Sequence, residues 1–109
     1  MPVKSISAVA LSGWLADAAR PRPVVLDVRE PWEVALCRLD GGLAVPMREV
    51  PARLAEIDLE APIVCVCHHG ARSMQVALFL EARGAADVHN LSGGVAAWAQ
   101  QVDPAFPTY

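Results

Sequence analysis

The sequence lacks any long apolar segment. A membrane-spanning helix needs ~20 consecutive apolar residues, and every apolar run in this chain of 109 residues is far shorter. The first residues, 1–6, also lack the apolar stretch of a secretory signal peptide. The sequence therefore predicts a protein that has no membrane association and stays in the cytoplasm.

Basic residues are few and scattered. The chain carries nine Lys and Arg residues against twelve Asp and Glu residues, which gives a formal net charge of −3. Proteins that bind nucleic acid usually present a basic face. We therefore expect no nucleic-acid partner.

Cysteines are also few, and their number is odd. The chain has three, and Cys65 and Cys67 are separated by a single residue. Disulfide frameworks use even numbers of cysteines, and residues two apart on a strand lie ~6.7 Å apart along it, which is too far for a disulfide. The spacing also does not match a structural zinc site. The sequence predicts free thiols in a reducing compartment, with no metal and no cofactor.

Apolar residues are plentiful at 54% of the chain, with 19% charged residues, and this composition is typical of a folded protein. The length suits one domain, so we expect residues 1–109 to form a single domain. Strand and helix patterns alternate, which predicts an α/β fold with an open, mostly parallel sheet covered by helices. The expected strands are 24–28, 43–45, 62–67 and 87–91, and the expected helices are 7–19, 31–36, 48–57, 72–83 and 95–102.

In such folds the ligand site lies outside the carboxyl ends of the strands. Three segments of this chain follow predicted strands and contain polar residues or glycine: residues 27–29, 67–72 and 91–94. We expect these three segments to meet at one edge of the sheet and to form the functional site.

Cys67 closes the most apolar predicted strand and begins a short loop that leads into a helix. A sulfur at this position lies near the loop's backbone N–H groups and near the positive end of the helix dipole. Arg72 adds a positive charge, and Gly70 supplies the backbone freedom that a tight loop needs. These features stabilise a thiolate, so the pattern predicts a nucleophilic cysteine at the centre of an anion-binding loop.

The spacing of Cys67 and Arg72 indicates which group the loop would hold. The loop has six residues, one fewer than the Cys-x5-Arg loop with which cysteine-dependent phosphatases enclose a phosphoryl group. A tighter loop is better matched to one added sulfur atom than to a phosphate. The spacing favours a persulfide, and a cysteine-dependent phosphatase or arsenate reductase is the alternative.

Four segments resemble the rhodanese-like sulfurtransferases, in the same order and at matching spacings. The segment Cys67–Ser73 resembles the family's Cys-x-x-Gly-x-Arg-Ser active-site loop. The other three segments are similar to the family's Asp-x-Arg-Glu signature, to the stretch that ends in Ile-Pro, and to its Gly-Gly-x-x-x-Trp segment; they are Leu26–Glu33, Leu39–Pro46 and Leu91–Trp98.

The resemblance implies a rhodanese-like fold, with a five-stranded, mostly parallel sheet flanked by helices on both faces. It also implies a thiosulfate sulfurtransferase, in which Cys67 takes a sulfane sulfur from a donor such as thiosulfate. The persulfide would then pass this sulfur to cyanide or to a thiol, on a small molecule or on a protein. The alternative within the family is a slow or non-enzymatic persulfide carrier that binds a partner.

The resemblance also implies roles for the neighbours of Cys67. The residues expected to bind the donor are His68, His69, Gly70, Ala71, Arg72, Ser73 and Arg29. Asp27 is expected to support the site through hydrogen bonds to the nearby backbone. His68 and His69 either tune the charge of the loop near neutral pH or are only solvated. Cys65 is expected in the core, and Cys37 is expected to pack, with a resolving thiol as the less favoured role.

Overall fold

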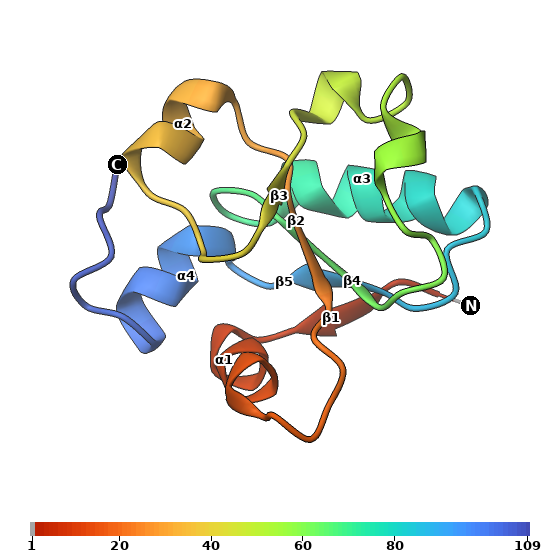
Figure 1. Ribbon diagram of the computed structural model, residues 1–109. Coiled ribbons are helices and arrows are strands. Elements are labelled where there is room, and N and C mark those ends of the chain that lie inside the picture. The colour runs from red at the N-terminus through yellow and green to blue at the C-terminus, as the bar shows by residue number, and fades with distance from the viewer. Residues whose placement is uncertain (1) are drawn as a thin grey trace.

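The computed structural model describes residues 2–109, which form a five-stranded parallel sheet with helices on both faces (Figure 1). The strands follow the order β1-β5-β4-β2-β3, and all four strand pairs are parallel. The strands are β1 (Lys4–Ile6), β2 (Val24–Asp27), β3 (Leu43–Ala44), β4 (Ile63–Val66) and β5 (Val88–Leu91). The helices are α1 (Ala8–Ala16), α2 (Pro31–Leu36), α3 (Ala71–Ala82) and α4 (Gly94–Gln101), with 3-10 turns η1 (Met47–Glu49) and η2 (Leu54–Glu56). The predicted α/β fold class is confirmed.

Strand β4 lies at the centre of the sheet and is buried on both faces. Ile63 and Cys65 pack into one core cluster, while Val64 and Val66 pack into the other. Because successive side chains of a strand point to opposite faces, an apolar strand of this kind requires cover on both sides. Helix α3 and the 3-10 turns cover one face, and helices α1 and α4 cover the other.

The edge strand β1 was not among the strands predicted from the residue pattern. It is only three residues long, and two of them, Lys4 and Ser5, are exposed. So short a segment shows no apolar alternation. It pairs with β5 in parallel from Lys4 to Ile6, and only the family resemblance implied a fifth strand.

The helix predicted over residues 48–57 is wrong. The structure has two 3-10 turns there, joined by a turn that contains Pro51. Proline has no N–H, so the hydrogen-bond ladder of an α-helix is interrupted at this point. A single α-helical hydrogen bond remains, from the N–H of Arg53 to the carbonyl of Glu49 at 3.0 Å. The other predicted elements are present, although the first helix ends at Ala16 rather than Ala19.

The carboxyl ends of β2, β4 and β5 meet at one edge of the sheet, where α4 begins against the loop that follows β4. The N–H groups of Val95 and Ala96 donate to the carbonyls of Cys67 and His68 at 2.9 and 3.1 Å. Gly94 has a φ of +59°, and a Cβ at this residue would overlap with those same two carbonyl oxygens. Glycine at position 94 therefore allows α4 to hold the loop in place.

We predict that Gly94→Ala lowers the free energy of unfolding by roughly 2–4 kcal/mol, because the substitution adds a left-handed backbone penalty and a collision with the loop. Urea unfolding measures this change. Gly84→Ala is the matched control, since Gly84 has a φ of +99° but no atoms within 4 Å of an added Cβ. We expect that control to cost about 1–2 kcal/mol. Equal losses in both variants would show that contact with the loop is not the cause.

Candidate active site

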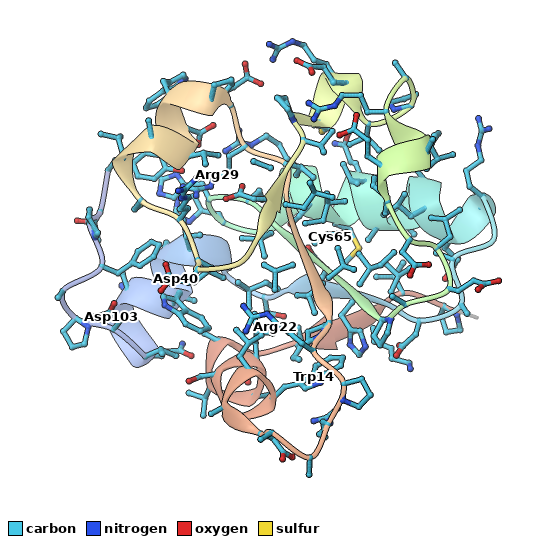
Figure 2. The ribbon with its side chains drawn as sticks, in the orientation of Figure 1. Trp14, Arg22, Arg29, Asp40, Cys65 and Asp103 are labelled. Atoms are coloured by element: carbon cyan, nitrogen blue, oxygen red, sulfur yellow. The ribbon has the colours of Figure 1, made fainter. Side chains whose placement is uncertain are left out.

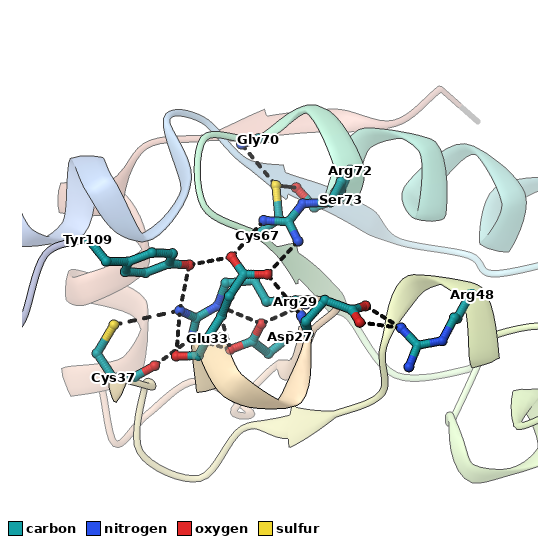
Figure 3. Close-up of polar contacts among 11 residues, drawn as sticks. Asp27, Arg29, Glu33, Cys37, Arg48, Cys67, Gly70, Arg72, Ser73 and Tyr109 are labelled. Atoms are coloured by element: carbon teal, nitrogen blue, oxygen red, sulfur yellow. Dashed lines mark hydrogen bonds and ion pairs between the residues drawn. The ribbon is translucent and has the colours of Figure 1, made fainter. Parts of the chain in front are cut away.

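Cys67 lies directly after β4 and is the first residue of the loop that leads into α3. Its Sγ accepts a hydrogen bond from the backbone N–H of Gly70 at 3.0 Å and lies 3.2 Å from the Oγ of Ser73 (Figure 3). Gly70 adopts a φ of +109°, a left-handed conformation that favours glycine. This conformation turns the chain from the loop into α3, and the N–H of Gly70 points at the sulfur, so the loop curls around Cys67.

Helix α3 begins at Ala71, one residue earlier than predicted, and Arg72 and Ser73 lie in its first turn. The positive end of the helix dipole therefore lies beside the Cys67 loop. Ser73 is fully buried, whereas Ala71 is exposed. The first turn thus brings a hydroxyl group to Sγ and a guanidinium group to the same edge of the sheet.

Asn90 on β5 fixes the shape of the loop from beneath. Its Nδ2 donates to the carbonyl of Gly70 at 3.0 Å, and its Oδ1 accepts a hydrogen bond from Ser73. The Ser73 hydroxyl lies within hydrogen-bond distance of both Asn90 and the Cys67 sulfur, and its single proton can be donated to only one of them at a time. Asn90 was not predicted as a site residue, although a polar residue near the carboxyl end of an apolar predicted strand was a usable signal.

The charge of Arg72 is matched by Glu33, which lies on α2. The guanidinium binds the carboxylate through two hydrogen bonds, at 2.6 and 2.8 Å. The Glu33 side chain is 4% exposed and that of Arg72 is 34% exposed. Pairing with Arg72 lowers the pKa of Glu33 to about 2, and this effect exceeds the opposite effect of burial. From the sequence, Glu33 was only part of a motif and had no expected role in the site. Because it neutralises Arg72, the site is less positive than expected from Arg72 alone.

Arg29 is completely buried, which is at odds with the expected contact to an anionic donor. Its Nε and Nη2 bind the carboxylate of Asp27 at 2.9 and 2.7 Å, and Nη2 also donates to the carbonyl of Cys37 at 2.6 Å. Burial by itself would lower the pKa of Arg29, but hydrogen bonds to Asp27 and Tyr109 raise it instead. The guanidinium therefore faces protein groups in this structure, whereas the sequence predicted that it would bind the donor.

Tyr109 reaches this cluster from the other end of the chain. Its hydroxyl donates to Oε2 of Glu33 at 2.6 Å and accepts from Nη1 of Arg29 at 3.1 Å. Burial raises the pKa of Tyr109 to about 12, so the phenol keeps its proton at neutral pH. The two residues Tyr109 and Glu33 are 76 positions apart, and no sequence motif connects them, so this contact could not be predicted.

His68 and His69 differ in their surroundings. The ring of His68 stacks between those of His69 and Tyr109, with centroid distances of 4.0 and 4.1 Å. Burial and the neighbouring His69 lower the pKa of His68, which keeps this imidazole neutral at neutral pH. His69 is exposed. Both histidines line a cavity beside the loop, and His68 is the one that stacks on Tyr109.

The other two cysteines lie in different environments. Cys65 is fully buried in the core between the sheet and α3, where burial raises its pKa to about 12 (Figure 2). The Sγ of Cys37 accepts a hydrogen bond from Nη1 of Arg29 at 3.6 Å. All three cysteines are free thiols. The thiol of Cys65 therefore remains protonated in neutral solution.

Within residues 2–109, no group of three or more His, Cys, Asp or Glu side chains is arranged to hold a metal ion. No helix in this part of the chain has the length and apolar character that crossing a membrane requires. The chemistry available at this edge of the sheet is that of a thiol with N–H and hydroxyl donors and a nearby ion pair.

Comparisons with known proteins agree with the fold described above. The model of the rhodanese-like domain family matches residues 11–101. The chain is 37% identical over 98 residues to a sulfurtransferase of Allochromatium vinosum, covering 90% of each protein. It is 36% identical over 75 residues to the thiosulfate sulfurtransferase GlpE of Pseudomonas fluorescens, covering 69% of each.

Two further comparisons define the extent of the likeness. The chain is 34% identical over 113 residues to the chloroplastic rhodanese-like/PpiC domain-containing protein 12 of Arabidopsis thaliana, of which it spans only 38%. The crystal structure of a rhodanese-like domain protein from Staphylococcus aureus superimposes with a TM-score of 0.83 at 30% identity, covering 98% of this chain and 99% of that one. With the family model and these relatives in agreement, the chain belongs to the rhodanese-like domain family.

Proposed function

We propose that the protein moves a sulfane sulfur from thiosulfate to a thiophilic acceptor through a persulfide on Cys67. The observation that carries this proposal is the position of the Cys67 sulfur at the start of a six-residue loop. The sulfur accepts a hydrogen bond from the N–H of Gly70 and lies beside the hydroxyl of Ser73, the residue that follows the loop. The N–H of Gly70 stabilises negative charge on the sulfur, and the Ser73 hydroxyl does the same when its proton turns from Asn90 to the sulfur. The same donors can bond to the attacking thiolate and to the persulfide anion that replaces it.

In the first half-reaction, the Cys67 thiolate attacks the outer sulfur of thiosulfate. A sulfur–sulfur bond forms at Cys67, the sulfur–sulfur bond of thiosulfate breaks, and its electron pair leaves with sulfite. The total charge is the same on both sides, and no separate oxidant is needed. The start of α3 and the partly exposed Arg72 favour binding of the anionic donor at this edge of the sheet.

In the second half-reaction, cyanide or an acceptor thiolate attacks the outer sulfur of the persulfide. The bond to Cys67 breaks, the acceptor leaves with the sulfur, and Cys67 returns to a thiolate. Thiosulfate as the donor is supported by the likeness to the Pseudomonas thiosulfate sulfurtransferase. The free thiols fit a reducing compartment such as the cytoplasm.

A slow persulfide carrier is the second candidate. Cys67 is only 1% exposed, and Glu33 already occupies the guanidinium of Arg72. Both features restrict the approach of a free anionic donor. A carrier would already hold a persulfide when it is isolated and would turn over thiosulfate poorly, so the state of the purified protein distinguishes the two candidates.

We predict that thiosulfate adds ~32 Da, the mass of one sulfur atom, to the wild-type protein and that cyanide removes it. Cys67→Ser should gain no mass, because a hydroxyl group does not form a persulfide. Intact-protein mass spectrometry measures both states. Cys37→Ala is the control, since Cys37 lies outside the Cys67 loop, and this variant should load like the wild type. A wild-type protein that gains no sulfur from thiosulfate would contradict the proposed reaction.

We predict that Glu33→Gln destabilises the protein by about 2–3 kcal/mol at pH 7. The pKa of Glu33 is lowered to about 2 in the folded state, so the carboxylate stabilises the fold above its unfolded pKa. That contribution is lost as the pH falls from about 4.5 toward 2, and the two proteins should converge there. Urea unfolding across this pH range measures the difference.

Glu56→Gln is the matched control for this prediction. Glu56 pairs with Arg53 at 2.8 Å on the exposed surface, where ion pairs contribute little to stability. We expect its unfolding curve to match that of the wild type at every pH. A constant gap between Glu33→Gln and the wild type down to pH 2 would show that ionisation of Glu33 is not what stabilises the fold.

A further inference from the structure

The segment that follows α4, residues 103–109, returns along the molecule to lie against α2 (Figure 1). We call this segment the strap. Its first anchor is Phe106, which is 8% exposed and packs into the core shared with α1 and α4. Its second anchor is the hydroxyl of Tyr109, which bonds to Glu33 and Arg29. The strap therefore joins α4 to the cluster beside Cys67.

Between these two anchors the strap is loosely held. Within residues 2–109, no hydrogen bond fixes the backbone of residues 107–109. A cavity of about 190 Å³ lies between the strap and the active-site loop, and its lining includes His68, Ala96, Pro107 and Thr108. Segments with few backbone hydrogen bonds and unfilled space beneath them open at a low cost in free energy. Tyr109 therefore holds this part of the strap in place, through its two hydrogen bonds and its ring contacts with His68 and Trp32.

Tyr109 bridges the two sides of the site. Its ring lies nearly parallel to that of His68, at an angle of 14°, and His68 is the residue next to Cys67. Figure 3 shows the hydroxyl pointing at the Glu33 carboxylate, whose other side faces Arg72. Cys67 is only 1% exposed, and Tyr109 contacts two groups beside it: the ring of His68 and the Glu33 carboxylate that pairs with Arg72.

We propose that Tyr109 is a specificity-determining residue, the latch of a strap that limits access to Cys67 to small reagents. The effect of this latch on catalysis rests on the proposed function, in which the strap would select the acceptor that takes the sulfur. Cyanide or a small thiol reaches the persulfide with the strap closed. A bulky thiol requires the strap to open before its thiolate can attack the outer sulfur, break the bond to Cys67 and leave as the new persulfide.

The first test measures access to the thiol and does not depend on sulfur transfer. Iodoacetamide and fluorescein-5-maleimide are a small and a bulky alkylating reagent, and fragmentation of the peptide that contains both Cys65 and Cys67 assigns the reaction to Cys67. The quantity measured is the ratio of the alkylation rate with the bulky reagent to that with the small reagent. In Tyr109→Ala we expect this ratio to rise roughly tenfold, because two hydrogen bonds and a ring stack are lost.

Two further variants complete this test. Tyr109→Phe keeps the ring stacked on His68 but loses both hydrogen bonds, so we expect an intermediate rise in the same ratio. Thr108→Ala alters the strap beside the latch, and its ratio should equal that of the wild type. Because Tyr109→Phe is a small change, it keeps the test valid if Tyr109→Ala unfolds. An unchanged ratio in Tyr109→Phe, or an equal rise with both reagents, would overturn the proposal.

The second test applies the same comparison to sulfur transfer. The persulfide is loaded and measured by mass, and 2-mercaptoethanol and glutathione then serve as small and large thiol acceptors. We expect Tyr109→Phe to raise kcat/KM for glutathione several-fold relative to 2-mercaptoethanol. Failure to load contradicts the proposed function, whereas normal loading with an unchanged acceptor ratio contradicts the latch.

Discussion

The ion pair between Glu33 and Arg72 is the interaction on which the arrangement of the site depends. It joins α2 to the first turn of α3 through two short hydrogen bonds, and the carboxylate is almost completely buried. A buried carboxylate of this kind is stable only with its charge matched and its oxygens bonded. Tyr109 supplies a third hydrogen bond, and its hydroxyl links the pair to Arg29. Two arginines, one glutamate and one tyrosine thus hold three parts of the chain together beside Cys67.

The three thiols differ in their surroundings because they lie at different positions relative to the carboxyl edge of the sheet. Cys65 and Cys67 lie two positions apart and face the same core, yet only Cys67 extends past the strand into a loop with N–H and hydroxyl donors. Cys65 stays inside the sheet, where burial keeps it protonated. Cys37 packs against the buried Arg29. Cys67 is the candidate nucleophile because it lies just past the end of β4, whereas the other two cysteines are packed in the core.

Features that depend on a local residue pattern could be predicted from the sequence, whereas contacts between residues far apart in the chain could not. The alternation of apolar segments gave the α/β class, and the spacing of Cys67, Gly70 and Arg72 placed the loop. Pro51 broke a helix that apolar spacing favoured, because spacing does not register a missing N–H. Arg29 was expected at the donor, but burial depends on packing that a single sequence does not show. Tyr109 contacts Glu33 only because the fold brings together residues that are 76 positions apart.

The central claim is that sulfur resides on one thiol of the three, and peptide mapping tests it most directly. After thiosulfate treatment and alkylation, trypsin places Cys65 and Cys67 in one peptide, between Arg53 and Arg72, and Cys37 in another. Fragmentation of the shared peptide then assigns the added sulfur to a single residue. The account predicts that the sulfur lies on Cys67 alone. Sulfur on Cys65 or Cys37, or its absence from the Cys67 peptide, would contradict it.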